Sequence, residues 1–186
     1  MFVEIKNFIT EQFCDEISNL CYPHMDDSSL EYEFNRQGNS VRFSDHKKEL
    51  VYIDNRLRKR FNEIVEKKLK FDFRLDLSRL QDSGFTFHRY GEKDNLYIHG
   101  DGIINELPGF PRVLSTVIHL TNNPNADLIF PRHDKHIKTE KGKLVAFLPH
   151  DCYEHYCNNN SGSSREVVVT WLLDNKLILK ENDGKA

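Results

Sequence analysis

A run of short apolar segments that begins after Phe71 constrains the fold of this chain more than any other feature of its sequence. Polar turns that carry Gly or Pro separate the segments, as at Glu106–Gly109 and Asn122–Asn125. Many short strands at fairly regular spacing are typical of a sandwich, barrel or jelly roll. The sequence therefore predicts a β-rich body. Its expected strands are 80–90, 96–101, 113–120, 128–130, 144–147, 153–157 and 165–174.

The first 70 residues have a mainly helical period instead. After a short strand at Phe2–Ile5, Thr10 can cap a helix that Tyr22 and Pro23 end. Residues 24–43 are polar and are expected to form a loop. The expected buried face of this first helix carries Phe13, Ile17 and Leu20.

A second, longer helix is expected from Ser44-Asp45 to about Lys68. Apolar residues recur along it at three- and four-residue spacing, which is the pattern of one buried face. Its other face is basic, and we interpret that face as solvent-exposed. The apolar residues are Leu50, Ile53, Leu57, Phe61, Ile64 and Val65.

These periods predict an α+β fold in which helices pack on a β-rich body. A chain of 186 residues has the length of one ordinary domain. We therefore expect a single domain over residues 1–186, with helical support from 1–70 and a β core over 71–180.

The composition narrows the classes of partner. The chain has 29 acidic residues against 26 Lys and Arg, a net charge of −3, which disfavours nucleic acid because phosphate contacts require a basic surplus. No apolar run approaches the roughly 20 residues that cross a bilayer. The N-terminus lacks the pattern of a secretory signal, and the four cysteines form no CxxC pair. We expect a cytoplasmic protein with reduced thiols and no membrane partner.

His99-Gly100-Asp101 is the motif most suggestive of chemistry. Side chains two residues apart on a strand point to the same face, so His99 and Asp101 are expected to aim at one point. Two histidines and one carboxylate form the facial triad of non-haem Fe(II) oxygenases. His150 and His155 can each supply the third ligand. Arg165 heads the last strand, and its planar fork suits the buried carboxylate of a co-substrate.

Together, these motifs resemble the prolyl 4-hydroxylase-like branch of the Fe(II)/2-oxoglutarate-dependent dioxygenases over about residues 78–175. His88-Arg-Tyr90-Gly is similar to the family's first core strand, and Gly142–Phe147 is similar to the strand before the distal histidine. Phe147 lies eight residues before His155, as the family pattern requires. This spacing, with that of Arg165, favours His155 over His150 as the third ligand.

The resemblance implies a double-stranded β-helix, which is a cupin-type jelly roll. The implied Fe(II) ligands are His99, Asp101 and His155. The implied 2-oxoglutarate-binding residues are Arg165, Tyr90 and His119. His119 departs from the family, because many relatives have a second tyrosine there. Asn125–Leu128 matches the family's Gly-Gly-Glu-Leu turn only loosely.

The activity implied is hydroxylation of an unactivated C–H by O2 and 2-oxoglutarate, giving succinate and CO2, with ascorbate as a candidate reductant. The expected substrate is a prolyl or other amino-acid residue of a peptide or protein, a free amino acid or another small molecule. Candidate contacts for a substrate carboxylate are Arg112, Arg132 and Lys135. Two alternatives remain: a zinc-dependent hydrolase with the same ligands, and a noncatalytic cupin-like binding module.

The remaining histidines have less specific surroundings. We interpret Arg132–His136 as a polar loop beside the barrel mouth, and His24 and His46 as surface residues. His88 is expected either in the pocket or packed in the core. Trp171 is interpreted as a core residue.

Overall fold

Two antiparallel sheets face each other in the computed structural model, which describes residues 1–25, 38–92, 94–102, 111–158 and 163–174. The larger sheet contains, in order, β1 (Phe2–Ile5), β9 (Leu144–Phe147), β6 (Arg112–His119), β11 (Arg165–Asp174), β4 (Thr86–Tyr90) and β2 (Asn39–Arg42), and β3 (Leu80–Asp82) also pairs with β11. The smaller sheet contains β5 (Asn95–His99), β10 (His155–Asn158), β7 (Asn123–Phe130) and β8 (Lys135–Thr139).

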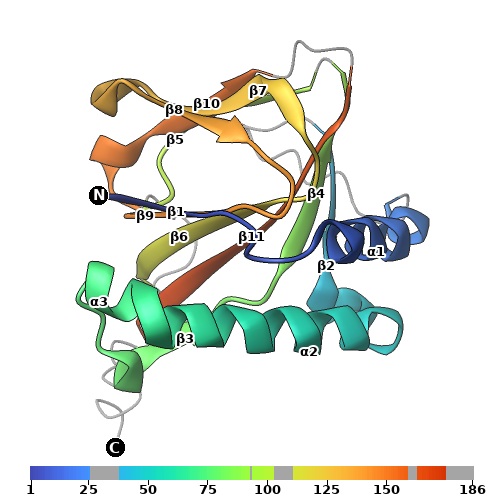
Figure 1. The fold of residues 1–186 in the computed structure, drawn as a ribbon, viewed down its shortest axis with the longest axis horizontal. Helices are drawn as coiled ribbons and strands as arrows, with labels where there is room; N and C mark the ends of the chain where they lie inside the picture. The colour runs from blue at the N-terminus through green and yellow to red at the C-terminus, as the bar shows by residue number, and fades with distance from the viewer. Residues whose placement is uncertain (26–37, 93, 103–110, 159–162, 175–186) are drawn as a thin grey trace, which may run out of the picture.

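The helices cover the face of the larger sheet that points away from the smaller sheet (Figure 1). α1 (Glu11–Cys21) begins at Thr10, whose hydroxyl accepts a hydrogen bond from the Phe13 amide. The expected second helix is α2 (Lys47–Ile64), which follows the 3-10 turn Phe43–His46 and continues through a π-helical turn, Val65–Leu69, into α3 (Lys70–Asp72). The long amphipathic helix is therefore confirmed.

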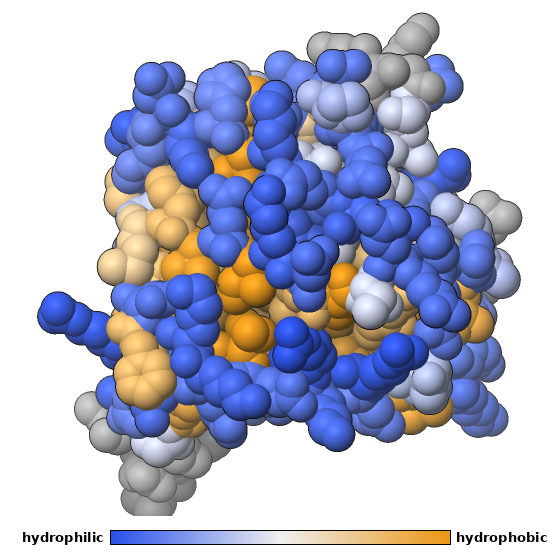
Figure 2. All heavy atoms as spheres, in the orientation of Figure 1, coloured by the Kyte–Doolittle hydropathy of each residue, from blue (hydrophilic) through white to orange (hydrophobic). Residues whose placement is uncertain are grey.

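Strand alternation gives the larger sheet two apolar faces with different partners. Phe87, Ile118 and Val168 belong to the buried cluster that includes the apolar residues of α1 and α2. Val117 and Phe147 point the other way and pack with Leu128, Phe130 and Ile137 of the smaller sheet. Figure 2 shows that the surface over α2 is mostly hydrophilic, with hydrophobic residues exposed mainly between this helix and the smaller sheet. The site described below lies between this second face and the smaller sheet.

A buried carboxylate joins α1 to the larger sheet. Glu166 on β11 is 2% exposed and accepts hydrogen bonds from the Ser18 and Tyr22 hydroxyls at 2.7 and 2.8 Å. The Arg89 guanidinium on β4 lies 3.3 Å from the same carboxylate. These partners replace the hydration that Glu166 loses on burial, so the docking of the helix is directional as well as apolar.

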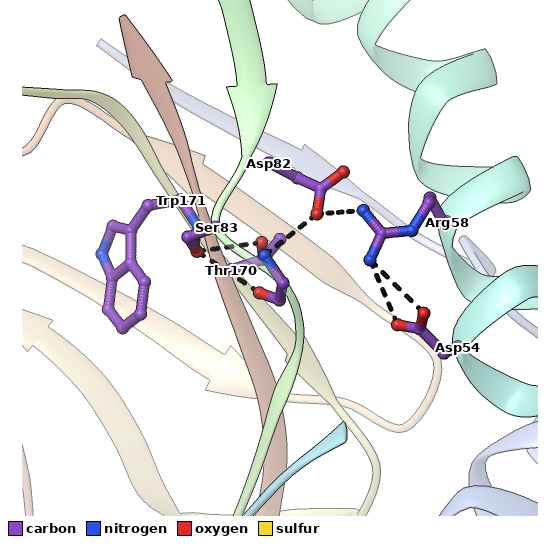
Figure 3. Close-up of polar contacts among 7 residues, drawn as sticks. Asp54, Arg58, Asp82, Ser83, Thr170 and Trp171 are labelled. Carbon is purple, nitrogen blue, oxygen red and sulfur yellow. Dashed lines mark hydrogen bonds and ion pairs between the residues drawn. The ribbon is translucent and has the colours of Figure 1, made fainter. Parts of the chain in front are cut away.

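A second polar cluster ties α2 to the turn between β3 and β4 (Figure 3). Arg58 on α2 forms ion pairs with Asp54, one turn earlier, and with Asp82 at the end of β3. Asp82 also accepts a hydrogen bond from the Gly84 amide, and the Ser83 hydroxyl accepts one from the Trp171 amide of β11. The long helix is thus fixed to the sheet by the packing of its apolar face and by the ion pair between Arg58 and Asp82.

The division into helical support over 1–70 and a β core over 71–180 is wrong at two strands. β1 pairs with β9, and β2, which lies in the expected loop over 24–43, pairs with β4. Both strands lie at edges of the larger sheet. Each pairs with a strand that is far away in sequence, so its own sequence does not reveal the pairing. Residues 26–37 and 175–180 of these ranges lie outside the described part of the chain, as does the expected turn at Glu106–Gly109.

Other differences concern the ends of strands. The expected strand 80–90 divides into β3 and β4, and the expected strand 128–130 extends back to Asn123. Arg132–His136 is only in part a loop: Pro131–His133 forms a 3-10 turn, and β8 begins at Lys135. The polar side chains of β8 obscured its period. Leu20, expected on the buried face of α1, is 37% exposed.

No helix among the described residues is long and apolar enough to cross a membrane.

We predict that the buried and exposed sides of α2 differ sharply in their effect on stability. Ile53 is fully buried and Val51 is 49% exposed. Ile53→Ala is expected to lower the free energy of unfolding by roughly 2–5 kcal/mol, because it leaves a cavity between helix and sheet. Val51→Ala, its control, is expected to change it by less than about 0.5 kcal/mol. Urea unfolding followed by circular dichroism measures both, and equal losses would contradict the packing described.

Candidate metal and co-substrate site

The pairing of β10 with β5 brings three potential metal ligands together. His155 is the first residue of β10 and lies opposite His99, the last residue of β5. Asp101 follows two residues later, in the turn after the strand. The ligand atoms of the three side chains all lie within 4.8 Å of one another. The triad expected from the sequence is therefore assembled, although the strand argument for Asp101 is wrong, because β5 ends before it.

Both imidazoles are oriented in the same way. The His99 Nδ1–H donates to the Tyr97 carbonyl at 2.8 Å, and the His155 Nδ1–H donates to the Tyr153 carbonyl at 3.1 Å. A carbonyl can only accept, so these bonds select the tautomer whose Nε2 is free to bind a metal. The His99 Nε2 atom lies 3.6 Å from an Asp101 carboxylate oxygen. Such backbone partners hold ligating histidines in place before a metal binds.

A close backbone approach places Asp101. A Cβ atom on Gly102 would lie 2.2 Å from the Pro149 carbonyl oxygen, so only glycine fits there. The turn after β5 therefore lies directly against the segment that leads to His155. His150 is exposed and lies outside the group of three, so the geometry supports His155 as the third ligand.

Burial and charge act in opposite directions on the triad. Burial by itself would raise the pKa of Asp101. The interactions with His155, His99, Ser115 and Arg112 outweigh burial, so the pKa of this carboxyl group is below its ordinary value. Burial lowers the pKa of His155 to about 4, against the opposing effect of the Asp101 charge. At neutral pH the site holds one carboxylate and a neutral His155, which is the protonation state that metal binding requires.

A buried cation shares the interior with the triad. Arg165, at the start of β11, is 1% exposed and lies opposite Tyr90 of β4, with its guanidinium 5.1 Å from the ring centroid. Its Nε and Nη1 atoms have no hydrogen-bond partner among the described residues. Its charge lowers the pKa of both His155 and His119. An unpaired guanidinium is costly to bury, so this interior is suited to an anion.

His119 lies on the same face as Arg165. It is the last residue of β6, fully buried, and lies opposite Val167 of β11, which in turn lies opposite His88 of β4. Neither ring nitrogen of His119 has a hydrogen-bond partner within the described segments. Burial, followed by the charges of Arg165 and Lys143, holds its pKa well below the ordinary value. His119 is therefore a neutral side chain with a free N–H beside a buried cation.

The other end of this face holds the expected Arg112 together with two residues that sequence reasoning missed, Trp171 and Ser115. Trp171, interpreted as core, is only partly buried, and the Arg112 guanidinium lies 3.8 Å from its ring centroid. Arg112 also donates to the Asp101 carbonyl at 3.0 Å. Ser115 lies opposite Trp171 in the sheet. The signal was the period of two along β11, which places Trp171 on the face of Arg165.

The remaining polar candidates have protein partners. Arg132 pairs with Glu154 at 3.0 Å, and Lys135 pairs with Glu4 at 2.9 Å. Of the three residues expected to meet a substrate carboxylate, Arg112 is the one beside the triad. His24 and His46, interpreted as surface residues, are half-buried and contact each other with ring centroids 4.2 Å apart.

The chain is similar in structure to prolyl hydroxylases. The viral collagen prolyl hydroxylase of Paramecium bursaria Chlorella virus-1, in complex with 2-oxoglutarate, superposes with a TM-score of 0.72 at 17% identity over 93% of this chain and 96% of that one. A Pseudomonas putida prolyl-4-hydroxylase gives 0.67 at 14% identity over 93% and 92%.

A prolyl hydroxylase from Trichoplax adhaerens, in complex with a peptide fragment of hypoxia-inducible factor, gives 0.70 at 14% identity over 100% and 87%. This chain has the fold of the prolyl hydroxylases. The expected α+β double-stranded β-helix is thereby confirmed, and so is the resemblance on which it depended, at the level of the fold. No family model and no curated protein sequence matches the chain.

We predict that His119 makes the protein less stable as the pH is lowered. Its pKa is lowered on folding, so below about pH 6.5 the unfolded chain takes up a proton that the folded protein excludes. Between pH 7.5 and 5.5, the metal-free protein is expected to lose about 1.4 kcal/mol more than His119→Phe, which has no group to titrate there. Urea unfolding at both pH values measures the difference, and parallel losses in the two proteins would refute it.

Proposed function

We propose that this chain is an Fe(II)- and 2-oxoglutarate-dependent hydroxylase, which oxidises an unactivated C–H with O2 and forms succinate and CO2. One observation carries the proposal: the triad of His99, Asp101 and His155 lies in the same buried interior as Arg165, whose Nε and Nη1 atoms have no hydrogen-bond partner among the described residues. A metal site beside a buried cation suits a co-substrate that chelates at one end and carries a carboxylate at the other.

The triad fits Fe(II) by its donor set. Two imidazole nitrogens and one carboxylate oxygen are the ligands of non-haem Fe(II) oxygenases, and they leave positions open for other molecules. The carbonyls of Tyr97 and Tyr153 hold the two histidine rings in the ligating tautomer. When bound, the iron would activate O2, which is the oxidant, and 2-oxoglutarate would supply two electrons as it is converted to succinate and CO2. The protein supplies the orientation and keeps water out.

The far end of the co-substrate fits Arg165 and His119. Arg165 has free N–H groups at Nε and Nη1, and one edge of its guanidinium fork can donate to the two oxygens of a carboxylate. The neutral His119 ring can add a third donor from the neighbouring strand, and Tyr90 packs against the guanidinium. These groups make up for the hydration that a carboxylate loses in such an interior. We therefore assign the co-substrate carboxylate to Arg165, Tyr90 and His119.

The substrate class follows from the opposite end of the same face. Arg112 donates to the Asp101 carbonyl and lies over the Trp171 ring, so the two side chains offer a cation and an aromatic surface near the proposed metal site. An amino-acid unit presents both an apolar C–H and a carbonyl or carboxylate, which these two side chains can bind. We propose a prolyl or other amino-acid residue, or a free amino acid, as substrate. The peptide complex of the Trichoplax neighbour supports a peptide or protein substrate.

We predict that 2-oxoglutarate turnover requires the triad. Purified protein given Fe(II), ascorbate, O2 and 2-oxoglutarate is expected to form succinate in a screen of free amino acids and proline peptides. His155→Ala and Asp101→Ala are expected to lower the rate at least about a hundredfold, because each removes a ligand from a three-ligand site. His150→Ala is the matched control and should retain activity. Tight zinc with hydrolysis and no need for 2-oxoglutarate would contradict the proposal.

We also predict that Arg165 and His119 act on co-substrate affinity. Arg165→Gln is expected to weaken 2-oxoglutarate binding by about a hundredfold, and His119→Phe by about tenfold, because each deletes hydrogen bonds to a buried carboxylate. His119→Tyr retains a donor and should recover most of the affinity. Calorimetric titration of the Mn(II)-loaded protein measures all three. Unchanged affinity in Arg165→Gln would refute the proposal that the co-substrate carboxylate binds to Arg165.

A further inference from the structure

The first strand of the chain bridges the two sheets. β1 pairs with β9 at the edge of the larger sheet, with Phe2 opposite Phe147 and Glu4 opposite Val145. Phe147 and Val145 belong to the cluster that packs against the smaller sheet, so Phe2 and Glu4 point toward that sheet as well. Glu4 pairs with Lys135 of β8 at 2.9 Å. Thus β1 contacts the smaller sheet through every second side chain.

Phe2 extends this contact toward the distal metal ligand. Its ring centroid lies 4.7 Å from that of Phe130 and 5.2 Å from that of Tyr153, both in edge-to-face geometry. Phe130 in turn lies 5.3 Å from the His155 ring. Tyr153 supplies the carbonyl that accepts the His155 Nδ1–H bond. Phe2 therefore contacts both Phe130, which packs on the His155 ring, and Tyr153, whose carbonyl accepts its Nδ1–H bond.

The His155 ring also packs against Phe147. Phe147 lies 4.9 Å from it and also packs edge-on against Phe130 at 4.9 Å. The imidazole is 3% exposed, so its orientation is set by the side chains around it. Loss of the Phe2 ring would leave a space behind Phe130 and Tyr153, and buried aromatic rings relax into such space.

We propose that Phe2 is a positioning residue for the distal metal ligand: through Phe130 and Tyr153 it holds the His155 imidazole in its ligating orientation. This inference depends on the proposed metal site. Among the described residues, the ring contacts of Phe2 are with Phe130, His133 and Tyr153 and not with a metal-ligating side chain. Its effect is on metal affinity, because a ligand that must be re-ordered on binding costs free energy that a held ligand does not.

The same strand offers a matched control. Val3 is 8% exposed and points to the opposite face, where it joins the cluster under the helices. Val3→Ala loosens the docking of β1 without removing any contact near His155. Phe2→Leu keeps most of the side-chain volume and should restore most of the packing behind Phe130. The three variants separate a loss of strand docking from a loss of ligand support.

The experiment is a Co(II) titration of metal-stripped full-length protein, followed by the d–d absorption of the ion, with thermal unfolding measured on each variant. Phe2→Ala is expected to weaken Co(II) binding by about tenfold, the scale for residues that orient a metal ligand. Phe2→Leu is expected to stay within about threefold of wild type, and Val3→Ala within about twofold although its midpoint of unfolding falls.

Two results would overturn the inference: wild-type affinity in Phe2→Ala, or an equal loss of affinity in Val3→Ala. If Phe2→Ala does not fold, Phe2→Leu and Val3→Ala still decide the question, because a greater loss of affinity in Phe2→Leu supports the positioning role and the reverse order refutes it. His155→Ala tests the underlying site independently. Wild-type affinity in His155→Ala would refute the metal site and this inference together, whereas an effect there with none at Phe2 would refute only the inference.

Discussion

The antiparallel pairing of β10 with β5 is the interaction on which the site depends. It places His155 opposite His99, residues that are far apart in sequence, and the register of the pair sets the distance between their rings. The close approach of Gly102 to the Pro149 carbonyl then adds Asp101. Backbone hydrogen bonds and one glycine therefore define the geometry of the three ligands before any ion is bound.

The buried charges of the interior differ in whether they have partners. Asp101 is surrounded by imidazoles and by Arg112, so it remains ionised although it is buried. Among the described residues, Arg165 has no such counter-ion, and His119 beside it has no hydrogen-bond partner. Buried groups of this kind lower the stability of a folded protein. They are characteristic of functional sites, where a ligand supplies the missing partner.

Two strands of the larger sheet, β11 and β1, connect this interior to the helical layer. Glu166 points away from the site and fixes α1, while its neighbour Arg165 points into it, so one strand carries two buried charges on opposite faces. β1 has a similar division, with Val3 under the helices and Phe2 toward His155. Alternation along single strands thus couples the helical layer to the site.

The sequence by itself determined the fold class, the long helix expected from Ser44-Asp45 to about Lys68, and the three candidate ligands that the structure brings together, because helical period and motif spacing are local properties. It could not define β2, the turn that carries Asp101 or the place of Trp171, since these depend on which strands pair and in what register. The choice of His155 over His150 came from spacing, but the orientation of its ring was decided by Tyr153, Phe130 and Phe2. Only the tertiary structure decides such contacts, because they join segments that are far apart in sequence, and no periodic pattern in the sequence relates these segments to one another.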